Sequence, residues 1–362
     1  MYQFSKDLIH ISVDSGKGGT KYCYLNQKSE LATDVIITNI ESASPNEEIK
    51  GSCDDVVLDL GNDKTKRYFV GDREGNVVID SDSTKLMEKH EICIYTAIAR
   101  VLTQHLDLEL TQEVETEQGK EMELITHKIS LTVNVPLHEF RDKLTKQKYV
   151  EKYENKEITL TINKNKVKFH IVNASVFYES QGAIIRNNQL INQNDEMHNV
   201  LVIDCGSRND THVLFNNKIV PVKGKNTVGR AGIHSELAKF ASELSVRTGD
   251  DFTVGLIESV LVGKTTLKNI TRDELIEQFA PYALDVAKNI LRTTKTLQVS
   301  KNNTDILFTG GASVVLRKQL QEVYELDGGD DKKNGYSVYF SADPRFDNCK
   351  GALIKELSKL VS

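Results

Sequence analysis

The chain has 362 residues, which suits about two domains with full hydrophobic cores. Its charges are mixed, with a net charge of -6 at pH 7, and this disfavours broad binding of nucleic acid because such binding needs a basic surface. The five cysteines form no CxxC pair, which favours a reducing compartment over disulfides or a zinc site. The sequence shows no signal peptide and no apolar run of membrane-spanning length. We therefore expect a soluble, cytoplasmic protein without a membrane partner.

The first predicted element is a pair of short strands joined by a glycine turn. The apolar strand Ile11–Val13 ends at Asp14, the turn at 15–20 is rich in glycine, and the apolar strand Tyr22–Leu25 follows. Taken alone, an Asp and glycines between two strands indicate an ordinary hairpin.

Helices and strands alternate after this turn. Apolar residues at helical spacing predict a helix around Ile94–Val101, and a strand at 129–135 ends at Pro136. The Glu- and Gln-rich stretch 105–128 is expected to be a solvated loop or a hairpin. The stretch 158–172 alternates around a polar turn and is predicted to be a hairpin.

A carboxylate stands before the next predicted helix. Glu179 directly precedes the helix that starts near Gln181. The helix dipole stabilises a carboxylate at this position, so the residues alone indicate a role in capping. The following stretch 187–199 is rich in Asn and Gln and is expected to be a connector.

A second strand, turn and strand of the same design lies at 200–215. Asp204 ends its first strand, Gly206 stands in the turn, and an apolar strand starts at Val213. The segment 228–232 then opens a helix from Ser235.

A long helix and a strand complete this half of the chain. The helix starts with a capping box of Thr271 and Glu274, which satisfies two backbone donors. Pro281 removes one hydrogen bond inside the helix, so we expect a kink near it. The strand at 305–309 ends at two glycines, and a helix at 314–323 follows.

The two glycine turns are therefore followed by corresponding elements. Each is followed by a helix and then by a strand, which predicts an α/β fold with one unit present twice. We expect domain I to comprise 1–192 with a return at 336–362, and domain II to comprise 193–335. Two such turns can close on one polyphosphate from both sides, with backbone N–H groups facing the phosphates and each Asp reaching a metal ion through water.

Several segments, in the expected order and over nearly the whole chain, resemble ParM-like actins. These proteins form the plasmid-segregation branch of the actin and sugar-kinase ATPase superfamily. The resembling segments are Asp14–Lys21, Thr132–Leu137, Phe177–Ala183, Asp204–Ser207, Thr309–Ala312 and Asp343–Gly351. The resemblance implies an actin-like ATPase fold, in which two related ribonuclease-H-like domains flank a nucleotide cleft.

The resemblance also implies the roles of individual residues. ATP, or GTP in its place, would bind with Mg²⁺, which Asp14 and Asp204 would hold through water. Glu179 would position the attacking water, with Gln181 as the nearest competitor. Glycines let the backbone approach phosphate, and Lys21 would add a positive charge. The other nucleotide-binding positions implied are Gly16, Lys17, Gly18, Gly19, Thr20, Gly206, Ser207, Arg208, Asn209, Gly229, Glu236, Lys239, Gly310, Gly311 and Ala312.

One position departs from the family pattern. The second loop of the family commonly ends in Thr-Thr-Asp, whereas this chain has Asn209, Asp210 and Thr211. The acid stands one position early, and on a strand this shift turns its side chain to the opposite face. We therefore expect Asp204, and not Asp210, to serve the metal.

The function implied is that of an ATP-hydrolysing protein whose filaments segregate plasmid DNA. DNA would be reached through a small adaptor of the ParR type, without direct contact, which agrees with the acidic balance. The alternatives are a metabolic kinase of the same superfamily, another bacterial cytoskeletal actin and a chaperone-type ATPase. A kinase needs a general-base Asp in a substrate pocket, and the sequence offers no clear candidate.

Overall fold

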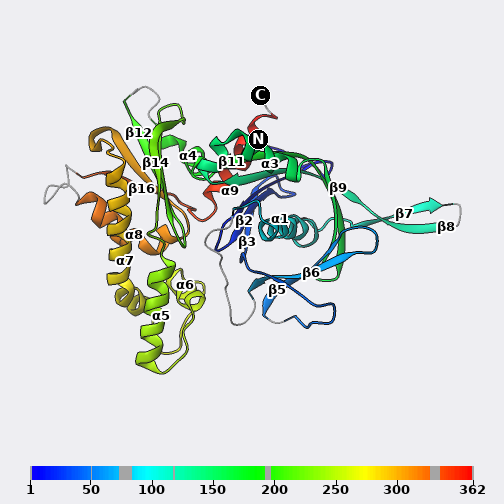
Figure 1. Cartoon of the computed structure of the whole chain (residues 1–362), viewed down its shortest axis with the longest axis horizontal. Helices are drawn as coiled ribbons and strands as arrows, with labels where there is room; N and C mark the ends of the chain where they lie inside the picture. The colour runs from blue at the N-terminus through cyan, green and yellow to red at the C-terminus, as the bar shows by residue number, and fades with distance from the viewer. Residues whose placement is uncertain are drawn as a thin grey trace. The chain divides into compact units, whose positions relative to one another are not determined.

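The computed structural model describes residues 2–49, 51–72, 84–116, 119–191, 197–326 and 335–360. The chain packs into two compact units (Figure 1). Unit 1 comprises Met1–Gly182 and Asn348–Ser362, and unit 2 comprises Ala183–Asp347. The domain limits expected from the sequence stay a prediction. The expected boundary at 192/193 and the polar stretch at 327–334 lie outside the described residues.

In the described part of unit 1, nine strands form one sheet in the order β3-β2-β1-β9-β11-β10-β5-β6-β4. The strands are β1 (Ile9–Ser15), β2 (Thr20–Leu25), β3 (Leu31–Ile36), β4 (Ile40–Ser42), β5 (Ser52–Asp59), β6 (Thr65–Asp72), β9 (Thr126–Val135), β10 (Lys156–Ile162) and β11 (Asn165–Tyr178). The helices are α1 (Glu88–Arg100) with its π-helical extension η1 (Val101–His105), α2 (Leu137–Arg141), α3 (Lys143–Tyr153) and the C-terminal α9 (Asp347–Ser358). Helix α4 (Gln181–Arg186) leads from unit 1 into unit 2.

In the described part of unit 2, five strands form a second sheet in the order β14-β13-β12-β15-β16. The strands are β12 (Asn199–Cys205), β13 (Asp210–Asn216), β14 (Pro221–Gly229), β15 (Thr304–Thr309) and β16 (Ser337–Phe340). The helices are α5 (His234–Thr248), α6 (Val254–Leu261), α7 (Arg272–Thr296) and α8 (Ala312–Glu325), with the short 3-10 helices η2 (Asn188–Leu190) and η3 (Lys301–Asn303).

The two sheets share one plan. The order β3-β2-β1-β9-β11 in unit 1 repeats as β14-β13-β12-β15-β16 in unit 2. In both, the first three strands are antiparallel and the last three are parallel. The prediction that one α/β unit is present twice is confirmed, and so is the α/β class.

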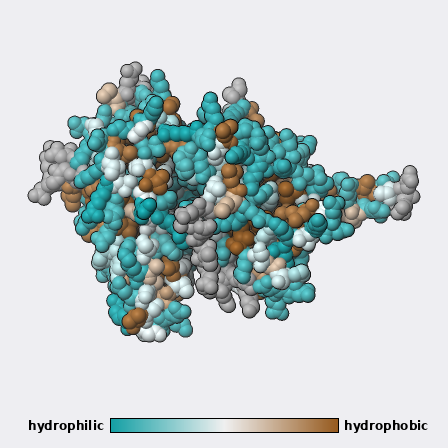
Figure 2. All heavy atoms as spheres, viewed as in Figure 1, coloured by the Kyte–Doolittle hydropathy of each residue, from teal (hydrophilic) through white to brown (hydrophobic). Residues whose placement is uncertain are grey.

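The cores explain the apolar runs of the sequence. Strand β12 has an unbroken apolar run, Val200–Ile203, in which every residue has 0% exposure. A central strand covered on both faces needs apolar side chains at successive positions. The surface visible in Figure 2 is mostly polar, with apolar residues in scattered groups. Among the described residues, no helix is long and apolar enough to cross a membrane.

Several local predictions are confirmed. The acidic stretch forms a two-stranded ribbon of β7 (Thr111–Thr116) and β8 (Gly119–Leu124), which projects from the rest of unit 1 (Figure 1). Helix α7 starts at the expected capping box, in which Thr271 and Glu274 hydrogen-bond each other's backbone. The helix continues through Pro281, and the kink expected there stays a prediction.

The capping box gives a first testable prediction. Thr271→Ala should destabilise the start of α7 by about 1 kcal/mol, because an N-cap oxygen is lost. Amide hydrogen exchange in the first turn of α7 should then accelerate about fivefold. Thr271→Ser keeps the oxygen and serves as the control. Equal exchange rates in both variants would show that the cap contributes nothing.

Candidate functional site

The two glycine turns close in the same way. The Gly16 N–H donates to the carbonyl oxygen of Gly19 at 3.2 Å, and the Gly206 N–H donates to that of Asn209 at 2.9 Å. A Cβ at Gly16 would lie 3.0 Å from the Gly19 oxygen, and one at Gly206 would lie 2.8 Å from the Asn209 oxygen. A side chain at 206 would therefore clash with the backbone of its turn, and one at 16 would make a tight contact.

A buried lysine joins two of the predicted site residues in unit 1. Lys85 is 8% exposed, and its Nζ lies 2.8 Å from Oδ1 of Asp14 and 2.8 Å from Oε1 of Glu179. The same Nζ donates to the carbonyl oxygen of Asn134 at 3.0 Å. Lys21 lies on the other side of Asp14, with 3.8 Å between its Nζ and Oδ2. The structure thus brings together Asp14, Lys21 and Glu179.

Lys85 was not among the residues predicted from the sequence. It stands alone, without a motif around it, and its role follows from contacts with residues more than 45 positions away in the chain. A buried lysine is costly unless it is paired. Burial alone would lower the pKa of Lys85, but Asp14 and Glu179 raise it above its usual value.

The carboxylate of Asp14 stays ionised in this setting. Burial alone would raise the pKa of Asp14, but the positive charges of Lys85 and Lys21 lower it below its usual value. Both oxygens of Asp14 already face ammonium groups. The carboxylate therefore suits a hydrated Mg²⁺, which keeps several waters, better than direct coordination of a bare ion.

A backbone hydrogen bond fixes the position of Glu179. Its N–H donates to the carbonyl oxygen of Val135 at 2.8 Å, at the end of β9. The next residue, Ser180, has φ 73°, which is rare for a residue other than glycine. Such strained positions cluster at functional sites. Gln181 is the first residue of α4, and its part in catalysis stays a prediction.

A buried polar network supports the first turn. Ser15 Oγ lies 2.7 Å from His90 Nδ1 and 3.0 Å from Thr20 Oγ1, which in turn lies 2.9 Å from Thr38 Oγ1. Burial, followed by the charge of Lys85, lowers the pKa of His90 to about 3. His90 is therefore neutral at pH 7, and Thr20 is occupied by this network.

In unit 2, the second turn lies against the glycines of the predicted adenosine segment. Gly310 has φ 83°, and a Cβ there would lie 2.2 Å from Oδ1 of Asp204. The Gly310 N–H donates to the carbonyl oxygen of Pro344 at 2.9 Å. Gly311 and Ala312 follow at the start of α8. Asp204 and Gly310 are thus brought together, and only glycine fits at 310.

Unit 2 also contains a guanidinium group, that of Arg208, with a buried N–H that makes no hydrogen bond to the described residues. The buried Nε of Arg208 has no hydrogen-bond partner among them. A Cβ at Gly232 would lie 2.1 Å from the Arg208 backbone, so the segment 229–232 packs directly on the turn. Glu236 and Lys239 pair with each other at 2.7 Å on α5, and their contact with nucleotide stays a prediction.

Asp210 makes contacts within unit 2 that differ from those of Asp204. It is fully buried, lies 2.5 Å from His212 Nε2 and accepts the N–H of Ala231 at 2.8 Å. A Cβ at Gly229 would lie 2.2 Å from its Oδ2. Asp210 therefore anchors the segment after β14 within unit 2, and the assignment of Asp204 in place of Asp210 to the metal stays a prediction.

The residues present fit a magnesium nucleotide. Unit 1 offers a tight turn with Lys17 and Lys21 and the ionised Asp14. Unit 2 offers a second tight turn and the unpartnered Nε of Arg208. Whether Asp14 and Asp204 face each other across a cleft stays a prediction.

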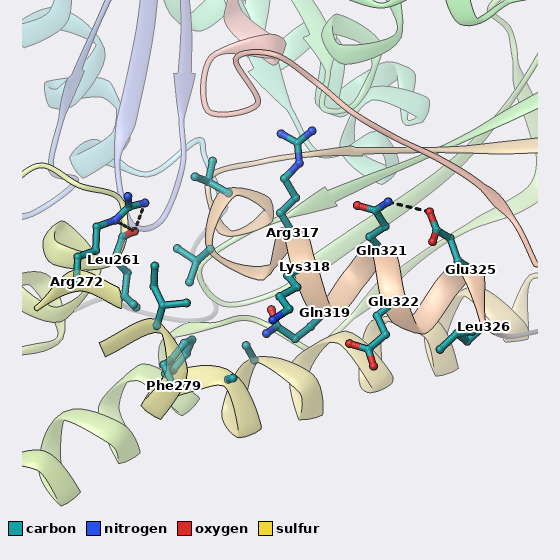
Figure 3. Close-up of a pocket in the computed structure, with 15 residues that line it drawn as sticks. Leu261, Arg272, Phe279, Arg317, Lys318, Gln319, Gln321, Glu322, Glu325 and Leu326 are labelled. Carbon is teal, nitrogen blue, oxygen red and sulfur yellow. Dashed lines mark hydrogen bonds between the residues drawn. The ribbon is translucent and has the colours of Figure 1, made fainter. Parts of the chain in front are cut away.

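A separate cavity of about 540 Å³ lies between α7 and α8 in unit 2 (Figure 3). Apolar residues such as Ile276, Phe279 and Val314 line it together with charged residues of α8, among them Lys318 and Glu322. The predicted nucleotide-binding residues do not line it, so we do not assign nucleotide to this cavity.

Comparisons with known proteins agree with this fold. Residues 12–182 match a family described as the N-terminal domain of actin-like proteins. The archaeal actin homolog Ta0583 is 17% identical with a TM-score of 0.70, over 96% of this chain and 99% of that one. Bacillus thuringiensis ParM with ATP is 14% identical with a TM-score of 0.68, over 99% and 100% of the two chains.

A third similar structure is the 15-stranded ParM filament from Clostridium botulinum, 18% identical with a TM-score of 0.66, over 99% and 100% of the two chains. A comparison with curated protein sequences finds no match. The fold of this chain is actin-like, and the resemblance to ParM-like actins that the sequence indicated is confirmed.

The buried lysine gives a second prediction. Lys85→Met should lower the free energy of unfolding by about 3 kcal/mol or more, because it leaves two carboxylates without their shared partner. The double variant Lys85→Met with Asp14→Asn should recover part of that loss. Urea denaturation measures both. Lys120→Met breaks an exposed pair with Glu113 and, as the control, should cost less than about 1 kcal/mol.

The neutral histidine gives a third prediction. Unfolded histidine protonates near pH 6.5, whereas native His90 stays neutral down to about pH 3. The unfolded state therefore binds more protons in this window, and stability falls as the pH drops from 6.5, by up to about 1.4 kcal/mol per unit from this residue. In thermal unfolding from pH 7 to 4, His90→Asn should flatten this dependence. A variant at the exposed His138 should not, and equal slopes in both variants would contradict the assignment.

Proposed function

We propose that this chain, which has the fold of actin-like proteins, binds and hydrolyses ATP with Mg²⁺ and assembles into dynamic filaments. The observation that carries the proposal is the contact of Lys85 with both Asp14 and Glu179 in unit 1. Asp14 is one of the two aspartates that the family resemblance assigns to the metal, and Glu179 is the residue that it assigns to the attacking water. Asp14 lies near the end of the phosphate-turn strand β1, and Glu179 lies just before α4.

Each residue has a physical role in this proposal. The two turns present backbone N–H groups to phosphate, while Lys21 and Arg208 add positive charge. Asp14 and Asp204 hold the water shell of Mg²⁺. The nucleotide and its metal supply the phosphoryl group and neutralise its charge. Glu179 accepts a hydrogen bond from the attacking water, and the ion pair with Lys85 holds the Glu179 carboxylate in place.

Filament formation is proposed from the relatives. The Clostridium botulinum ParM was solved as a filament, and the Bacillus thuringiensis ParM was solved with ATP. By analogy we assign self-assembly to this chain, with closure of the two units around nucleotide favouring the polymer and hydrolysis loosening it. GTP is the alternative to ATP in this proposal, because selection of the base depends on the shape of the pocket.

The cellular role proposed is segregation of plasmid DNA in the cytoplasm. A small adaptor of the ParR type would connect the filament to DNA, because the net charge of -6 does not favour direct binding of a polyanion. All five cysteines are without disulfides, which suits a reducing compartment.

Glu179 gives a fourth prediction. Glu179→Ala should keep binding of Mg²⁺ and ATP but lower the hydrolysis rate by about 10² or more, the usual contribution of a positioned general base. Filaments should then persist in a pelleting assay after ATP is supplied. Glu121→Ala, at an exposed position of β8, is the control.

Two results would redirect the proposal. Hydrolysis by Glu179→Ala at the parent rate would remove the role assigned to Glu179. ATP turnover that rises with a small hydroxylated metabolite, without light scattering by polymer, would instead favour a metabolic kinase.

A further inference from the structure

Asn348 contacts Asp14 and also Ser180, the residue that follows Glu179. It lies in the first turn of α9 and is 8% exposed. Its Oδ1 accepts the N–H of Ser180 at 2.9 Å, and its side chain also hydrogen-bonds Asp14. A single amide therefore connects the turn that carries Glu179 with the carboxylate that pairs with Lys85.

The packing of α9 fixes this amide in place. One turn after Asn348 stands Gly351, where a Cβ would lie 2.1 Å from the carbonyl oxygen of Gly182. Residues three apart share one face of a helix. The face of α9 that carries Asn348 therefore lies directly against the chain at the start of α4, with no room for a side chain at 351.

The contact with Asn348 explains the strained backbone conformation of Ser180. Its φ of 73° turns its N–H toward Asn348, and both residues are buried. Such a backbone conformation costs about 1–3 kcal/mol and persists only where the surroundings enforce it. The hydrogen bond that the Ser180 N–H donates to Asn348 helps to hold this conformation, and the strained turn in turn sets the direction in which Glu179 leaves the backbone.

We propose that Asn348 is a positioning residue, which holds Asp14 and Glu179 at a fixed separation for phosphoryl transfer. This inference rests on the proposed function for its catalytic part. Positioning matters in this chemistry because catalysis depends on orientation and charge stabilisation. The C-terminal helix of the chain thus contributes to a site whose other members come from the first half of the sequence.

A matched control exists in the same unit. Asn163 accepts the N–H of Asp55 at 2.9 Å and donates to Oδ1 of Asp54 at 2.7 Å. Its amide therefore makes the same two kinds of contact, to a backbone N–H and to a carboxylate, on the β5–β10 side of the sheet. Substitutions at Asn163 control for the general loss of a bridging amide.

The first measurement needs no nucleotide. Asn348→Asp keeps an oxygen for the Ser180 N–H but places a second carboxylate against Asp14, which should raise the pKa of Asp14 by about one unit or more. Carbon-13 NMR titration of labelled aspartates reads this pKa in the nucleotide-free protein. Asn163→Asp should leave it unchanged. An Asp14 pKa that does not move in Asn348→Asp would overturn the proposal.

The second measurement separates positioning from binding. Asn348→Ala should lower kcat for ATP hydrolysis at least about tenfold while the Kd for nucleotide stays within about threefold, because the interaction acts on the chemical step. Asn163→Ala should change neither value. A parent-like kcat in Asn348→Ala overturns the proposal, and if that variant does not fold, Asn348→Asp is measured in its place.

The outcomes also separate this inference from the proposed function. A parent protein that hydrolyses no nucleoside triphosphate would refute the proposed function, and the NMR titration would then decide only whether the side chain at 348 lies against Asp14. A hydrolysing parent with unaffected Asn348 variants would leave the function standing and refute the positioning role.

Discussion

The unit 1 site depends on one buried ammonium group. Lys85 Nζ lies within 3.0 Å of Asp14, Glu179 and the Asn134 carbonyl oxygen, which come from three separate parts of the chain. A charge in this position is tolerable only because its partners surround it. The pairing of β1 with β9 and of β9 with β11 places Asp14, Asn134 and the turn before α4 side by side, and Lys85 connects them there.

The two units share the same strand order and the same turn geometry, but the buried polar residues next to the two turns differ. Both turns close by the same backbone hydrogen bond, and both sheets have the same strand order. Beneath the first turn lies the neutral network of Ser15, Thr20 and His90, whereas the corresponding strand of unit 2 carries the buried pair of Asp210 and His212. The chain passes from unit 2 back to unit 1 between Asp347 and Asn348. Asp347 accepts a hydrogen bond from the Thr309 hydroxyl of unit 2 at 2.7 Å.

The sequence predicted what depends on local pattern. Apolar periodicity and glycine turns located the duplicated strands, and the capping box located the start of α7. Strand alternation predicted that Asp210, one position before the acid of the family pattern, would turn its side chain to the opposite strand face, and the Asp210 side chain is fully buried. Lys85 carries no such local signal, since its burial arises only when distant segments pack together. Asn348 stood in a recognised segment, but the contact that gives it a role needs α9 beside Gly182, which is a property of tertiary packing.

In the proposed function, Asp14 is held by Lys85 and serves a magnesium ion that accompanies ATP. Isothermal titration calorimetry of ATP binding, with Mg²⁺ and with EDTA, tests it most directly in the parent protein and in Asp14→Asn. Mg²⁺ should strengthen binding of ATP to the parent at least about tenfold, or about 1.4 kcal/mol, and this gain should disappear in the variant. An undiminished gain in Asp14→Asn, or a parent that does not bind ATP, would contradict it.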